Sequence, residues 1–274
     1  MALKDTVKLL ENKPNAERRE MIRNFLNKNK IKFVEEPFTD HLFKGVNIIC
    51  EFGKGKKDII VSAHYDKFMR SPGANDNGSG VACLFEIVKK LKRYRPKNKV
   101  KAVFFDREDT VNWCLGSKAY ISMHGINSIL GQYNLEMVGM GDAIGIWNVL
   151  EEDNGNPVLD NLVKTIKQKK LRAETAGQIP GFLSDHSPFR IAGLQSAYSV
   201  TTVKAEDVEF MRKFIKYPTI KKWFMFAFER KKLPLLFQAY HNHLDNSSIV
   251  EEKTLKNVTD VVYDAIVKLD KKVK

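Results

Sequence analysis

The sequence contains 274 residues, of which 43% are hydrophobic and 10% aromatic, so it can bury a core and is neither a disordered nor a fibrous chain. No apolar run approaches the roughly 20 residues of a transmembrane helix. Lysine and arginine outnumber aspartate and glutamate by 46 to 33, but the basic residues are scattered along the chain without a long block of like charge. We therefore expect solvated surface charge, and neither nucleic acid nor membrane as a partner.

The first residues of the chain and its cysteines bear on the cellular compartment in which we expect the protein. The first residues carry charge without the apolar stretch of a secretory signal. The three cysteines, Cys50, Cys83 and Cys114, are odd in number and lack metal-site spacing. We expect a cytoplasmic protein without a disulfide framework.

Hydrophobic spacing predicts alternating helices and strands in the first half of the chain. Two apolar stripes predict two helices within residues 3–30. Strands are predicted at 46–52 and 58–63, and the second is apolar on both faces, as a central strand should be. A helix at 79–94 and a strand at 100–105 follow. This strand–helix–strand order indicates a crossover unit in a helix-covered sheet.

The second half continues the pattern. Residues 135–139 and 195–200 are predicted strands, 157–171 a helix, and 250–268 an amphipathic helix with acidic residues in its first turn. The aromatic and basic segment 203–232 is helix-prone, and the sequence leaves open whether it is a lid, a dimer surface or a packed helix. Because no linker or repeat is present, we expect one α/β domain over residues 1–274.

Several carboxylates and two histidines follow predicted strands or precede the last helix. They are His64, Asp66, Asp76, Glu108, Asp109, Glu136 and His241. In open α/β sheets, ligands bind outside the carboxyl ends of the strands, so these side chains are expected to converge. Such a cluster repels itself without a cation. Histidine and carboxylate without thiolate suit zinc, or manganese or cobalt at the harder end.

Six ordered motifs carry a resemblance to a known family. They are His64-Tyr65-Asp66, Gly73-Ala74-Asn75-Asp76-Asn77-Gly78-Ser79-Gly80, Phe104-Phe105-Asp106-Arg107-Glu108-Asp109, Leu115-Gly116-Ser117, Ser184-Asp185-His186-Ser187-Pro188-Phe189, and Tyr240-His241 followed by Asp245. In this order the chain resembles the co-catalytic zinc aminopeptidases of peptidase clan MH, which also contains glutaminyl cyclases. The resemblance implies a three-layer α/β fold, with a central mixed, mostly parallel sheet covered by helices on both faces and an insertion around 203–232.

The resemblance also implies the metal ligands. Asp76 would bridge two divalent metal ions, with His64 and Glu136 completing one site and Asp109 and His241 the other. Relatives usually carry Glu where this chain has Asp109, and Asp where it has Glu136. Because one side chain is shorter and the other longer, we expect a compensated two-zinc site, with a one-metal site as the alternative. A cis peptide is expected at Asp76–Asn77.

Further roles follow from the same resemblance. Glu108 would be the general base, and Asp66 would orient His64 through its second ring nitrogen. Tyr240 would donate a hydrogen bond to the developing oxyanion, unless it only fills the core. Trp113 would line the pocket, as a tryptophan does in the cyclases, or would only pack. Ser184, Asp185 and His186 lack the nucleophile elbow of serine hydrolases. Asp185 and His186 are expected to form a wall of the pocket or to support its residues from behind.

Together these features predict a metal-dependent aminopeptidase that acts on peptides or amino-acid derivatives. One alternative is a glutaminyl cyclase that closes N-terminal glutamine. Another is a non-catalytic binding protein on the same fold. The sequence leaves the oligomeric state and the side-chain preference open.

Overall fold

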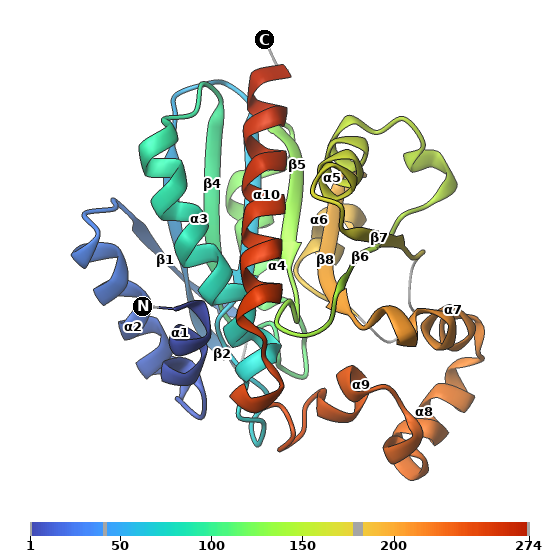
Figure 1. Ribbon diagram of the computed structural model, residues 1–274. Coiled ribbons are helices and arrows are strands. Elements are labelled where there is room, and N and C mark those ends of the chain that lie inside the picture. Colours follow the sequence, from blue (N-terminus) through green and yellow to red (C-terminus); the bar gives the residue numbers. More distant parts are fainter. Residues whose placement is uncertain (1, 41–42, 178–182, 273–274) are drawn as a thin grey trace.

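A mixed sheet forms the centre of the computed structural model, which describes residues 2–40, 43–177 and 183–272 (Figure 1). Its strand order is β1-β2-β4-β3-β5-β8-β6-β7. The strands are β1 (Val34–Asp40), β2 (Phe43–Phe52), β3 (Asp58–His64), β4 (Lys99–Phe105), β5 (Ile129–Leu135), β6 (Ala143–Trp147), β7 (Arg172–Thr175) and β8 (Ala197–Val203). β4, β3, β5 and β8 run parallel at the centre, whereas β1–β2, β2–β4 and β6–β8 are antiparallel pairs.

Helices cover both faces of the sheet, as expected for the three-layer fold (Figure 1). One face carries α1 (Leu3–Leu10), α3 (Gly80–Tyr94), α5 (Pro157–Gln168) and α10 (Glu252–Lys272), whose apolar stripes form the larger core. α4 (Leu115–His124) and α6 (His186–Ile191) cover the other face, where Tyr120 and Phe189 pack against Phe105. α2 (Asn15–Lys28) packs at the edge of the larger core through Ile22 and Leu26.

A helical segment lies beside the layers, at the lower right of Figure 1. It contains α7 (Val208–Lys216), α8 (Thr219–Phe228) and α9 (Leu235–Ala239). Phe214 and Phe237 join Met137 and Trp147 in a separate apolar cluster. This cluster connects the segment to the loops at the carboxyl edge of the sheet.

One predicted strand is wrong. The strand expected at 135–139 is instead β5, which ends at Leu135, so Glu136 follows the strand rather than lying in it. The interior of β5 holds Gln132 and Asn134, whose amides hydrogen-bond to Ser62 and Ser184. Neighbouring hydroxyls satisfy the amide of Asn134 and the NH2 group of Gln132, so a strand with two polar side chains in its interior can be largely buried.

Candidate active site

The carboxyl ends of three adjacent strands position most of the site. β3 ends at His64, β4 leads into the loop that carries Glu108 and Asp109, and β5 is followed directly by Glu136. Since β4, β3 and β5 are neighbours and parallel, these side chains meet at one edge of the sheet, as the sequence predicts. Asp76 comes from an irregular helical turn, Ala74–Ser79, that precedes α3.

Three side chains surround a first candidate metal position. Nε2 of His64 lies 3.3 Å from Oδ1 of Asp76 and 3.4 Å from Oε2 of Glu136. In a tetrahedral zinc site with ligands at about 2.0–2.1 Å, neighbouring ligand atoms are about 3.3–3.4 Å apart. All three residues are buried, and one ligand atom from each lies within 4.8 Å of the others. The spacing therefore fits a small divalent cation.

A second group shares the same aspartate. Nε2 of His241 lies 3.6 Å from Oδ2 of Asp76 and 2.8 Å from Oδ1 of Asp109. Asp76 thus presents one oxygen to each histidine. The ring of His241 also stacks on Phe68 at 4.3 Å and on Tyr240 at 3.8 Å between centroids. These stacked rings fix the plane of the imidazole. The peptide bond Asp76–Asn77 is cis, as expected.

The electrostatics of the two groups also suit a cation. Among the described residues, Nε2 of His64 and Oδ2 of Asp109 are buried without a hydrogen-bond partner. Burial alone would lower the pKa of His64, but Glu136 and Glu108 outweigh it and raise the pKa well above its ordinary value. Buried, unpartnered nitrogen and oxygen atoms facing one another are the donor set of zinc.

Glu108 also lies at ligand distance from its neighbours, because one atom from each of His64, Glu108 and Asp109 lies within 4.8 Å of the others. Its Oε2 lies 3.8 Å from Nε2 of His64, and the side chain lines the pocket. Burial raises its pKa well above the ordinary value, and the charges of Asp109 and Glu136 raise it further. A carboxyl with a raised pKa beside ligand groups is typical of a proton-transferring residue.

Asp66 links the first histidine to the loop after β4. Its Oδ1 lies 3.4 Å from Nδ1 of His64, and its two oxygens accept hydrogen bonds of 3.0 Å from the N–H groups of Glu108 and Asp109. Burial opposes ionisation, but the His64 ring and the two N–H donors outweigh it and lower the pKa of Asp66. One carboxylate thus contacts the histidine and accepts two hydrogen bonds from the acidic loop.

Hydroxyls and a second aspartate hold other members of the cluster. Ser184 donates a 2.7 Å hydrogen bond to Glu136, and Ser117 donates a 2.6 Å bond to Asp185. Asp245 accepts hydrogen bonds from the N–H of Asn75, at 2.6 Å, and of Asp76, at 3.3 Å. These contacts are positioning contacts. Of the expected wall residues, Asp185 and His186 are not among the described residues that line the pocket.

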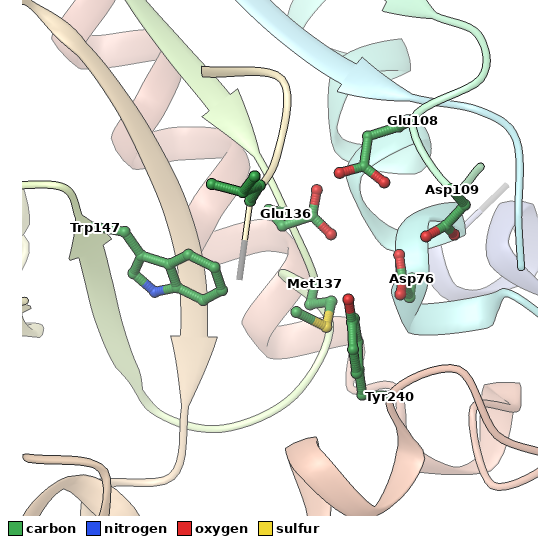
Figure 2. A pocket seen from close by; sticks show the side chains of 8 residues that line it. Asp76, Glu108, Asp109, Glu136, Met137, Trp147 and Tyr240 are labelled. Atoms are coloured by element: carbon green, nitrogen blue, oxygen red, sulfur yellow. The ribbon is translucent and has the colours of Figure 1, made fainter. Parts of the chain in front are cut away.

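The carboxylates open onto a small pocket with an apolar side. Figure 2 shows Met137 and Trp147 beside Glu136, and the hydroxyl of Tyr240 directed toward the carboxylates. Leu183 completes the apolar lining. Trp113 is 54% exposed and is not among the lining residues, so the expectation that it lines the pocket is wrong.

Sequence reasoning missed the apolar wall of this pocket. Met137 directly follows Glu136, and this position next to a candidate ligand could have indicated that Met137 lines the pocket. Trp147 ends β6, a short apolar strand that was not among the predicted strands.

The chain is similar in sequence to known peptidases. Residues 47–266 match the model of peptidase family M28. Aminopeptidase YwaD of Bacillus subtilis is 31% identical over 144 residues, which cover 51% of this chain and 31% of that protein. The chain spans less than half the length of the first curated relatives that it matches.

Two solved structures share the fold. A zinc aminopeptidase from Bacillus subtilis has a TM-score of 0.62 at 23% identity, covering 82% of this chain and 50% of that chain. Glutaminyl cyclase of Porphyromonas gingivalis has a TM-score of 0.72 at 19% identity, covering 99% of this chain and 98% of that chain. Both likenesses bear out the zinc exopeptidase-like architecture.

Proposed function

The chain belongs to peptidase family M28, and from the geometry of its site we propose that it is a metal-dependent aminopeptidase that removes N-terminal residues from peptides. The observation that carries the proposal is the carboxylate of Asp76, which presents one oxygen to His64 and the other to His241. Residues 1–274 would form one catalytic domain with a helical insertion around 203–232.

Two of the three candidate ligand groups among the described residues share the carboxylate of Asp76, and the third, His64 with Glu108 and Asp109, contains the residue that we assign to proton transfer. His64, Asp76 and Glu136 would hold one ion, and Asp76, Asp109 and His241 the other. Zinc suits these nitrogen and oxygen donors. The shorter Asp109 lies within hydrogen-bonding distance of His241, and the longer Glu136 reaches His64, which supports the compensated two-metal arrangement. When bound, the metal polarises the scissile carbonyl and lowers the pKa of water.

The remaining groups would move protons and bind the substrate. Glu108 would take a proton from the attacking water and deliver it to the leaving amine. Burial and the nearby carboxylates raise the pKa of Tyr240 well above its ordinary value, so its phenol stays protonated and can donate to the developing oxyanion. Met137, Trp147 and Leu183 would receive an apolar side chain of the N-terminal residue.

One assay panel tests this function. Zinc-loaded protein is incubated with leucine p-nitroanilide, with an alanine analogue and with a peptide that begins with glutamine, each with and without a chelator. We expect chelator-sensitive release of p-nitroaniline. Pyroglutamate formation without p-nitroaniline release would instead identify a glutaminyl cyclase. Zinc binding without either reaction would identify a binding protein.

A further inference from the structure

The outward face of α8 is apolar, contrary to the usual arrangement of a surface helix. Ile220, Trp223, Phe224 and Phe228 are 80%, 70%, 54% and 77% exposed. At about 100° per residue, these positions and the exposed Ala227 fall within one continuous arc of about 140°. The opposite face buries Met225 and half-buries Phe226, and it also carries a lysine, Lys222. A helix that only packed onto the protein would turn its large apolar residues inward.

Basic residues lie on both sides of this apolar face along the chain. Positions 212–232 hold eight basic residues and one acidic residue, so basic residues are more concentrated here than in the chain as a whole. Lys216, Lys221 and Lys231 are exposed. By contrast, Lys222 points inward and donates to the carbonyl of Ile215 at 2.9 Å, so the apolar arc itself carries no charge.

We propose that α8 and its flanking lysines form a docking surface for an anionic lipid bilayer, with the apolar arc inserted at the interface and the lysines on the headgroups. An apolar face bordered by lysines, with tryptophan and phenylalanine at its centre, is the pattern of helices that lie in the membrane plane. Each lysine near an anionic surface adds attraction. A second copy of this chain fits less well, because a two-fold contact would bring the basic clusters together.

This surface differs from a membrane span. No helix within the described residues is long and apolar enough to cross a bilayer. The sequence expectation of no membrane partner rested on that criterion, which does not detect a short helix lying in the interface.

The docking surface lies next to the candidate active site. Phe226 of α8 packs edge-on against Tyr240, with ring centroids 6.5 Å apart. α8 lies at the periphery of the molecule in Figure 1. Docking would therefore hold the pocket close to the lipid surface, and the proposal stands independently of which reaction the site performs.

Vesicle co-sedimentation tests the proposal. Wild-type protein is expected to bind phosphatidylcholine vesicles that contain phosphatidylserine, and to bind vesicles of phosphatidylcholine alone much more weakly. The double substitution Trp223→Ser and Phe228→Ser should lower the partition coefficient at least about tenfold. Ile191→Ser, at an 83% exposed position on α6, is the matched control and should change little.

Charge reversal separates a specific surface from general attraction. Lys216→Glu, Lys221→Glu and Lys231→Glu together should lower binding by about a hundredfold or more. The control triple, Lys54→Glu, Lys56→Glu and Lys57→Glu, changes the net charge equally in the exposed turn before β3 and should lower binding much less. Equal loss in both triples would overturn the proposal.

Fluorescence quenching by brominated lipid tests insertion directly. Trp223→Phe should retain binding and lose most of the quenching, whereas Trp113→Phe, at another exposed tryptophan, should retain the quenching. Quenching that is unchanged by Trp223→Phe would contradict insertion. Absence of vesicle binding, together with self-association or nucleic-acid binding that the α8 substitutions abolish, would assign the surface to that partner instead.

Discussion

His64 and His241 lie on opposite sides of a single carboxylate. Nε2 of His64 is 3.3 Å from Oδ1 of Asp76, and Nε2 of His241 is 3.6 Å from Oδ2. The two histidines are far apart in sequence, one at the end of β3 and the other after α9. Both candidate ligand groups therefore include Asp76.

Asp76→Asn should abolish metal binding and activity together. The amide keeps the shape but presents only one oxygen and no charge, so one ligand group loses its oxygen and both lose the negative charge. We expect at least about a hundredfold weaker zinc affinity, by analogy with the 10–100-fold effects of residues that merely support ligands. Chelator competition measures it, with Asp160→Asn, at an exposed position on α5, as the control. Wild-type affinity would exclude Asp76 as a shared ligand.

Tyr240→Phe should lower kcat with little change in zinc content or KM. Loss of one oxyanion donor typically lowers kcat by about 10²–10³-fold. The phenyl ring preserves the stacking on His241, so the loss reports on the hydroxyl alone. Steady-state kinetics with leucine p-nitroanilide measure it, and Tyr263→Phe on α10 is the control. An unchanged kcat would leave Tyr240 only a packing role.

Metal-free protein should lose stability as the pH rises from about 4 to about 7. Burial and neighbouring carboxylates raise the pKa values of Asp185 and Asp245 from 3.8 to about 7, so in this window the folded state binds protons that the unfolded state has released. The raised pKa of His64 acts in the same direction above 6.5. Stability therefore falls with rising pH.

Zinc should reverse this trend because the cation replaces the protons and binds more tightly as the pH rises. Thermal unfolding of chelated and zinc-loaded protein across the pH range measures both effects. A metal-free protein that gains stability between pH 4 and 7, or a midpoint that zinc does not raise, would contradict this electrostatic account.

Arg18→Met should destabilise the fold by about 3 kcal/mol, the scale of losing charged hydrogen bonds to buried carbonyls. Arg18 is fully buried and donates to the carbonyls of Tyr65, Pro72 and Gly73. These contacts hold the loop that leads to Asp76. Denaturant unfolding measures the change, with exposed Arg93→Met as the control. A change below 0.5 kcal/mol, the usual range for surface substitutions, would contradict the role of Arg18.

Two central strands, β3 and β4, were predictable because they are largely apolar on both faces, whereas the buried amides of Gln132 and Asn134 interrupt the apolar pattern of β5. β3 and β4 are short apolar runs, and the helix between them keeps a regular stripe, so their positions agree with the sequence prediction within a residue or two. β1 was not predicted, because this edge strand is mostly polar and only partly buried, and carries a proline. Tertiary pairing with β2, rather than local pattern, determines it.

The candidate ligands were predictable by type and order, whereas their surroundings were not. Strand ends carry His64 and Glu136, so topology predicts their convergence. No local pattern connects Trp147 or Ser184 with Glu136, because the contacts depend on the antiparallel pairing of β6 and on a loop conformation. Likewise, the outward apolar face of α8 was not predicted, because an apolar stripe on a helix normally packs against the protein interior.

The central claim is that Glu108 transfers protons beside a metal that other residues hold. Glu108→Gln preserves the shape of the side chain and removes the base. Zinc content and turnover of leucine p-nitroanilide are measured on the same preparation, with Glu209→Gln, at an exposed position on α7, as the control. We predict wild-type zinc content with kcat lowered at least about 10²-fold. Turnover at the wild-type rate would contradict the account and make Asp109 the next candidate for the base.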